Sequence, residues 1–128
     1  MKVERFEDLE IWQDARVLCK RIFEITSKEP FNHNFTLKDQ IQSSSGSVMD
    51  NIAEGFERGG NKEFINFLSI SKGSCGETRS QSYRAFDFNY IDQEILDELI
   101  MKTVQLSKKI SSLMSYLKKS DFKGSKFL

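Results

Sequence analysis

The sequence predicts an all-α protein, an antiparallel up-and-down four-helix bundle. Its 128 residues include one proline, and no run alternates apolar and polar residues at the period of two that a half-buried strand requires. Apolar residues instead recur at spacings of three and four in four separate stretches, which is the period of one helix face. The segments between these stretches are short enough to make successive helices antiparallel neighbours. We therefore expect one bundle domain over residues 1–118.

The first helix is expected from about residue 7 to about residue 27. Its apolar face is formed by Leu9, Trp12, Ala15, Leu18, Ile22 and Ile25. Pro30 disfavours helical backbone at the residue before it, so the helix should end there and residues 29–35 should form a loop.

The second helix is expected over residues 37–56, after a weak capping box formed by Thr36 and Asp39. Its centre is unusual, because residues 43–47 are serines and one glycine, which are poor helix formers. One interpretation is that small side chains let another helix approach closely. The alternative is a break in the helix at this point.

The third helix is expected over residues 62–86. Gly59 and Gly60 end the helix before it, and Asn61 is a candidate N-cap. Residues 69–76 form a second stretch rich in small side chains. We therefore expect the second and third helices to pack tightly, with one backbone near the other.

The fourth helix, residues 93–118, has the most regular pattern. Ile91 and Leu96 flank Asp92 as a hydrophobic staple around an N-cap. The apolar positions then alternate without interruption at Leu96, Leu99, Thr103, Leu106, Ile110, Leu113 and Leu117. Residues 119–128 are expected to be a flexible basic tail.

Composition excludes several classes of protein. Nineteen basic residues balance nineteen acidic ones, so no overall field attracts the chain to nucleic acid or to an anionic membrane. The N-terminal residues are charged at every second or third position and contain no apolar signal-peptide core, so a cytoplasmic location is expected. Cys19 and Cys75 lie far apart without a CxxC pattern, which favours reduced thiols.

No catalytic, cofactor-binding or metal-binding set is predicted. His33 is the only histidine, and it lies in the first predicted loop without a partner at a readable spacing. Di-metal bundles use a Glu-x-x-His motif on each of two helices, and the sequence contains no such motif. We therefore expect a protein that is not an enzyme.

The neutral total charge conceals one basic end. From Lys102 onward the net charge is +6, whereas residues 92–101 carry −4 and residues 1–91 carry −2. A possible nucleic-acid patch consists of Lys108, Lys109, Lys118, Lys119, Lys123 and Lys126. Such lysines can bind phosphate backbones by counterion release, or they can simply be a solvated helix end.

A second polar group lies near the end of the second helix. Asn51, Glu54 and Arg58 are spaced by three and four, on a different stripe from the apolar face. Together with Glu77, they are candidates for polar contacts that join the second and third helices or join two subunits.

The sequence resembles the 23S rRNA intervening-sequence proteins, also called the S23 or four helix bundle family. The resemblance covers nearly the whole chain to about Leu117. The matching pieces are Phe6-Glu7-Asp8-Leu9 with Trp12 and Ala15, Leu37 to Gln40, Asn51-Ile52-Ala53-Glu54-Gly55 with Arg58, and Phe64, Phe67-Leu68, Gly73-Ser74 and Glu77.

This resemblance implies an up-and-down bundle that assembles into a homo-oligomeric ring, typically of five subunits. The family includes proteins encoded in insertions within rRNA genes, and it resembles the accessory protein of diversity-generating retroelements, which is thought to bind nucleic acid. Relatives usually carry basic residues shortly before the NIAEG segment, where this chain has Gln42 and residues 43–45, all serine. We therefore expect a non-enzymatic homo-oligomeric scaffold or adaptor. The alternative is an accessory module that binds RNA or DNA through a basic face of the oligomer.

Overall fold

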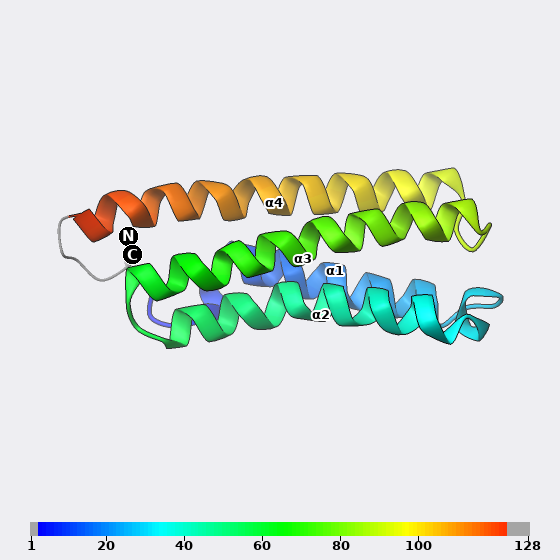
Figure 1. The fold of residues 1–128 in the computed structure, drawn as a ribbon, viewed down its shortest axis with the longest axis horizontal. Helices are drawn as coiled ribbons and strands as arrows, with labels where there is room; N and C mark the ends of the chain where they lie inside the picture. The colour runs from blue at the N-terminus through cyan, green and yellow to red at the C-terminus, as the bar shows by residue number, and fades with distance from the viewer. Residues whose placement is uncertain (1–2, 123–128) are drawn as a thin grey trace.

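A computed structural model describes residues 3–122, and the side chains of residues 3–120. Four long helices run up and down along one axis (Figure 1). The elements are η1 (Phe6–Asp8), α1 (Glu10–Thr26), η2 (Phe31–His33), α2 (Phe35–Glu57), α3 (Asn61–Asp87) and α4 (Gln93–Phe122). No strand occurs within the described range, so the predicted all-α class is confirmed. Within the same range, no helix is both long and apolar enough to cross a membrane.

The first two helices begin differently from the prediction. A short 3-10 turn, η1, replaces the first turn expected for α1, and α1 starts at Glu10. The N-cap of α2 is Asn34, not Thr36, because the Asn34 side chain accepts a hydrogen bond of 3.0 Å from the backbone nitrogen of Leu37. The helix then continues without a break through its serines, which settles the alternative left open by the sequence.

The last two helices also differ from the prediction at their ends: α3 is one residue longer at each end, and α4 is longer at its C-terminal end. Asn61 is the first residue of α3, where it is buried and donates from Nδ2 to the carbonyl oxygen of Leu117 at 3.2 Å. It therefore links α3 to the far end of α4, and Gly60 occupies the N-cap position. Asp92 caps α4 as predicted, accepting from the nitrogen of Ile95 at 2.9 Å. The helix extends to Phe122, beyond the predicted end at residue 118, and residues 123–128 of the expected tail lie outside the described range.

The core runs along the centre of the bundle and combines apolar residues from all four helices and from η2. The large side chains that are almost fully buried are Leu18, Ile22, Phe31, Leu37, Ile41, Ile52, Phe64, Leu68, Leu99, Leu106, Ile110 and Leu117. Ile11 is also buried, while Trp12 is only half-buried and packs edge-on against Phe6 with ring centroids 5.2 Å apart. Burial of this apolar surface stabilises helices that would be marginal in isolation.

One close contact between α2 and α3 lies at Gly55. A β-carbon at Gly55 would lie 2.6 Å from the β-carbon of Phe67 and 3.0 Å from Cδ1 of Phe64. By contrast, a β-carbon at Gly46, Gly73 or Gly76 would have no neighbour within 4 Å. The small-residue stretches also bring the two helices together, because Ser71 on α3 donates to the carbonyl oxygen of Val48 on α2 at 2.7 Å. Gly55 therefore adds a second close contact, at the end of α2.

Ion pairs close the contact between α1 and α4. Arg21 binds Glu98 through two hydrogen bonds of 2.8 and 2.9 Å, and this pairing lowers the pKa of the Glu98 carboxyl. Lys109 donates to Asp14 at 2.8 Å and to Glu10 at 3.1 Å, which raises the pKa of Lys109.

The close contact at Gly55 generates a first prediction. Replacement Gly55→Ala should lower the free energy of unfolding by about 1–3 kcal/mol, because the added methyl group overlaps with Phe67. The matched control is Gly76→Ala, also inside a helix but with open space around its α-carbon, which should raise stability by about 0.5–1 kcal/mol. Urea denaturation followed by circular dichroism measures both. Equal effects of the two substitutions would show that steric contact at Gly55 is unimportant.

Candidate functional site

The contact between α2 and α3 is lined at its centre by hydroxyl groups instead of aliphatic side chains. Serine and threonine in a helix can bond to the carbonyl group one turn earlier, and several do so here. Ser45 donates to the carbonyl oxygen of Ile41 at 2.8 Å, and Thr78 donates to that of Ser74 at 3.0 Å. These internal bonds satisfy hydroxyl groups that are buried, so the small polar residues are compatible with a packed helix pair.

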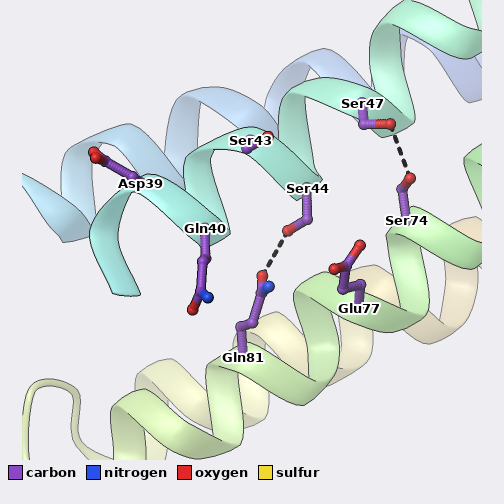
Figure 2. A pocket seen from close by; sticks show the side chains of 8 residues that line it. All are labelled: Asp39, Gln40, Ser43, Ser44, Ser47, Ser74, Glu77 and Gln81. Carbon is purple, nitrogen blue, oxygen red and sulfur yellow. Dashed lines mark hydrogen bonds between the residues drawn. The ribbon is translucent and has the colours of Figure 1, made fainter. Parts of the chain in front are cut away.

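Other hydroxyl groups bond across the two helices. Ser44 Oγ lies 2.8 Å from Thr78 Oγ1 and donates to Gln81 Oε1 at 2.7 Å (Figure 2). Farther along the contact, Ser47 and Ser74 share a hydrogen bond of 2.9 Å. Ser71 adds a bond of 2.7 Å to the carbonyl oxygen of Val48. Because hydrogen bonds require defined distances and angles, this network fixes the register of α2 against α3.

Outside this network the surface is hollowed into two adjoining recesses, of about 400 and 510 Å³, which share Ser43 and Ser47. We call them together the α2–α3 trough. Its lining residues are Asp39, Gln40, Gln42, Ser43, Ser44, Gly46, Ser47, Asp50, Asn51, Glu54, Ser74, Glu77 and Gln81. Figure 2 shows the part of the trough in which side chains from α2 and α3 face each other. The trough exists because short side chains leave the space above the helix pair open.

The trough is acidic. Four carboxylates line it, and its lining residues include no lysine, arginine or histidine. Among the described residues, Asp39, Asp50 and Glu77 make no ion pair. Hydroxyl, amide and carboxylate groups together form a surface that can accept cationic and hydrogen-bonding groups of a partner.

Gln81 is the buried polar side chain at the edge of this surface. It is 94% buried, and its oxygen accepts from Ser44. In the part of the chain that the structure describes, its amide nitrogen has no hydrogen-bond acceptor. Since Gln81 lines the trough, this donor is available to a group that enters it.

Three of the four polar residues predicted as contacts line the trough. Asn51 donates from Nδ2 to the carbonyl and hydroxyl oxygens of Ser47, at 2.8 and 2.9 Å. Glu77 lines the recess shown in Figure 2, whereas Asn51 and Glu54 line the adjoining one. The structure therefore places Glu77 in a different recess from Asn51 and Glu54.

Arg58 lies at the end of α2 and connects it to the start of α3. Its guanidinium group pairs with Glu54 at 2.7 Å and with Glu63 at 3.8 Å, and it lies 4.9 Å from the ring centroid of Phe67. These contacts are exposed, so each contributes little to stability. Arg58 thus contacts residues of both α2 and α3.

The predicted basic patch is only partly free. Lys109 is neutralised by Asp14 and Glu10. Lys108, Lys118 and Lys119 are exposed and make no ion pair with another described residue. Lys123 and Lys126 lie outside the described range.

Cys75 and His33 are the residues whose types could act as a nucleophile and as a base, and both make contacts within the bundle. Cys75 is buried and donates to the carbonyl oxygen of Thr103 at 3.2 Å, and burial raises the pKa of its thiol to about 11. His33 is exposed and lies 3.2 Å from Glu29. No group of three or more metal-ligating side chains occurs among the residues that the structure describes.

Sequence reasoning identified the small-residue stretches but not the trough. Asp39 was singled out only as part of a capping box with Thr36, and Asp50 and Gln81 did not stand out, because aspartate and glutamine are common on polar helix faces. The signal that could have found the two aspartates is positional: Asp39 and Asp50 lie eleven residues apart, slightly more than three helix turns, on both sides of the serine run.

Comparison with known proteins reveals two similarities. The family model described as 23S rRNA-intervening sequence protein matches residues 7–112. The fold is similar to that of a crystal structure from Bacteroides thetaiotaomicron VPI-5482, a protein of unknown function from the S23 ribosomal protein family. The TM-score is 0.74 and the identity 21%, over 81% of this chain and 97% of that one. No curated protein matches the chain.

The hydroxyl network generates a second prediction. Replacement Ser44→Ala should lower the free energy of unfolding by about 1–2 kcal/mol, because it removes the partner of the buried Gln81 oxygen. Ser43→Ala, one residue away but exposed, should change stability by no more than about 0.5 kcal/mol. Thermal and urea denaturation provide the comparison. If both variants unfolded like the wild type, the network would not determine how α2 and α3 pair.

Proposed function

Since this chain belongs to the family of 23S rRNA-intervening sequence proteins, we propose that it acts as a non-enzymatic scaffold or adaptor that assembles from several copies of itself. The resemblance described above implies a ring of five subunits. In this role the bundle supplies a rigid body, and its outer faces supply the contacts between copies.

The observation that carries this proposal is the α2–α3 trough. It lies on the outside of the helix pair, its lining includes four serines and one glycine, and it holds three carboxylates without a partner in the described chain. The serines and Gly46 leave space that a helix from another molecule can enter, beside the longer carboxylate and amide side chains of the lining. Asn51, Glu54 and Glu77, the residues expected to make subunit contacts, all line it.

Assembly through the trough makes a third prediction. Ser43 is exposed and belongs to both recesses, so Ser43→Arg should fill the trough and weaken self-association without unfolding the bundle. The matched control is Gln13→Arg, an exposed position on α1 outside the trough, which should leave the assembly unchanged. Light scattering coupled to size-exclusion chromatography measures the mass of each variant. A wild type that is monomeric at high micromolar concentration would refute self-assembly itself.

A second candidate function is binding of RNA or DNA. Lys118 and Lys119 favour it, since both are exposed near the end of α4 and neither forms an ion pair with another described residue. In a symmetric assembly, one such pair from each copy would multiply the modest charge of a single chain. The neutralisation of Lys109 and the serines that precede the NIAEG segment reduce the charge available for this function.

The fourth prediction tests this second function. If the lysines bind phosphates, fluorescence anisotropy with structured RNA should give an affinity that falls steeply as salt increases. The double substitution Lys118→Gln and Lys119→Gln should then weaken binding and reduce the slope with salt, whereas Lys20→Gln with Lys72→Gln should change neither. Absence of binding at low salt would remove this candidate.

A further inference from the structure

We propose that the α2–α3 trough is occupied by the outer face of α4 from a second copy of this chain. The inference rests on the self-assembly proposed above and names the two surfaces that would meet. It is carried by the spacing of exposed side chains on α2 and α4, by their charges, and by the position of these helices in the bundle.

The first surface is one side of α2. Positions separated by four, seven and eleven residues fall on a single stripe of an α-helix, and eleven residues span about 16 Å. We define the α2 stripe as Asp39, Ser43, Gly46 and Asp50, which have these separations and line the trough. A carboxylate lies at each end of the stripe, and small residues lie between them.

The second surface, the α4 stripe, repeats this spacing with the opposite charge. Its residues are Lys108, Ser112, Ser115 and Lys119, again separated by four, seven and eleven positions. All four are exposed. An ammonium group therefore lies at each end of the α4 stripe, about 16 Å apart along the helix, with two short hydroxyl side chains between them.

The two stripes are complementary in charge and in distance. Because the separations are equal, both lysines can reach both aspartates at once when the helices lie side by side. Within the described part of the chain, none of the two aspartates and two lysines forms an ion pair. All four charges are therefore available to a second copy. Across a protein interface, such complementary charges favour one partner and one register.

The middle positions permit close contact. A β-carbon at Gly46 would have nothing within 4 Å, so the backbone of α2 is accessible there. Ser112 and Ser115 on the α4 stripe are similarly short. The unpartnered amide nitrogen of Gln81, on the α3 side of the same trough, offers a hydrogen bond to a serine hydroxyl that enters it.

The stripes cannot satisfy each other within one molecule. The helices contact one another in the cyclic order α1, α2, α3, α4, so α2 and α4 occupy diagonal corners of the bundle. Figure 1 shows α4 and α2 on opposite sides of α3. Each copy therefore presents an acidic stripe on one side and a basic stripe on another, which requires a head-to-tail contact between copies. Repetition of such a contact closes into a ring or continues as a filament.

A charge-exchange experiment tests the proposal. The acidic-stripe variant carries Asp39→Lys and Asp50→Lys, and the basic-stripe variant carries Lys108→Glu and Lys119→Glu. Each variant alone should raise the dissociation constant for self-association by about tenfold or more, because like charges would face each other. An equimolar mixture of the two variants, and a chain with all four substitutions, should both assemble again. Analytical ultracentrifugation of the full chain gives these values.

Two matched controls separate the stripes from total charge. Asp87→Lys with Glu94→Lys, and Lys20→Glu with Lys72→Glu, make the same charge changes at exposed positions away from both stripes, and both should assemble like the wild type. Circular dichroism melts of all variants verify that the bundle is folded.

The outcomes distinguish this inference from the proposed function. If the wild type assembles and each stripe variant assembles equally well, the α2–α4 contact is overturned and the proposed scaffold function stands. Loss of assembly in both stripe variants without recovery in the mixture would also overturn it. A monomeric wild type whose Lys108→Glu and Lys119→Glu variant loses RNA binding would refute both proposals and assign these lysines to nucleic acid.

Discussion

The requirement that buried hydroxyl groups find hydrogen-bond partners governs the pairing of α2 and α3. Ser44 meets Thr78 and Gln81, and Ser47 meets Ser74, in only one register of the two helices. Apolar side chains tolerate some sliding because dispersion contacts have no strong directionality. Hydrogen bonds do not, so this polar contact fixes which residues face outward and where the trough lies.

The same residues make α2 a weak helix by itself. Serine and glycine have lower helix propensity than alanine, and five of them occur in succession at residues 43–47. The helix nevertheless continues from Phe35 to Glu57, because its inner face is buried by Ile41, Val48 and Ile52. The packed inner face thus stabilises an outer face whose short side chains leave a partner room to approach. Gly55 has a different role: because it has no side chain, Phe64 and Phe67 of α3 can pack against α2 near its C-terminal end.

The sequence was sufficient to predict the four helices, because apolar residues at spacings of three and four report burial directly. It was less informative at helix ends, where several residues can act as caps: Asn34 and Thr36 are equally plausible by type, and only the structure identifies Asn34. The role of Asn61 was unpredictable because its partner, Leu117, is 56 residues away. The trough was missed for a related reason, since it depends on the register between two helices, which local patterns do not encode.

The diagonal placement of α2 and α4 has a consequence for stoichiometry. If copies meet head to tail as proposed, the angle between the two outer faces of one bundle sets the turn from each copy to the next. That angle is determined by how the core side chains between the helices are packed, among them Phe64, Leu68, Leu106 and Ile110. The number of subunits in a closed assembly would then be encoded in the interior of the monomer, far from any subunit contact. Relatives with the same surface residues but different core volumes would close with different numbers of copies.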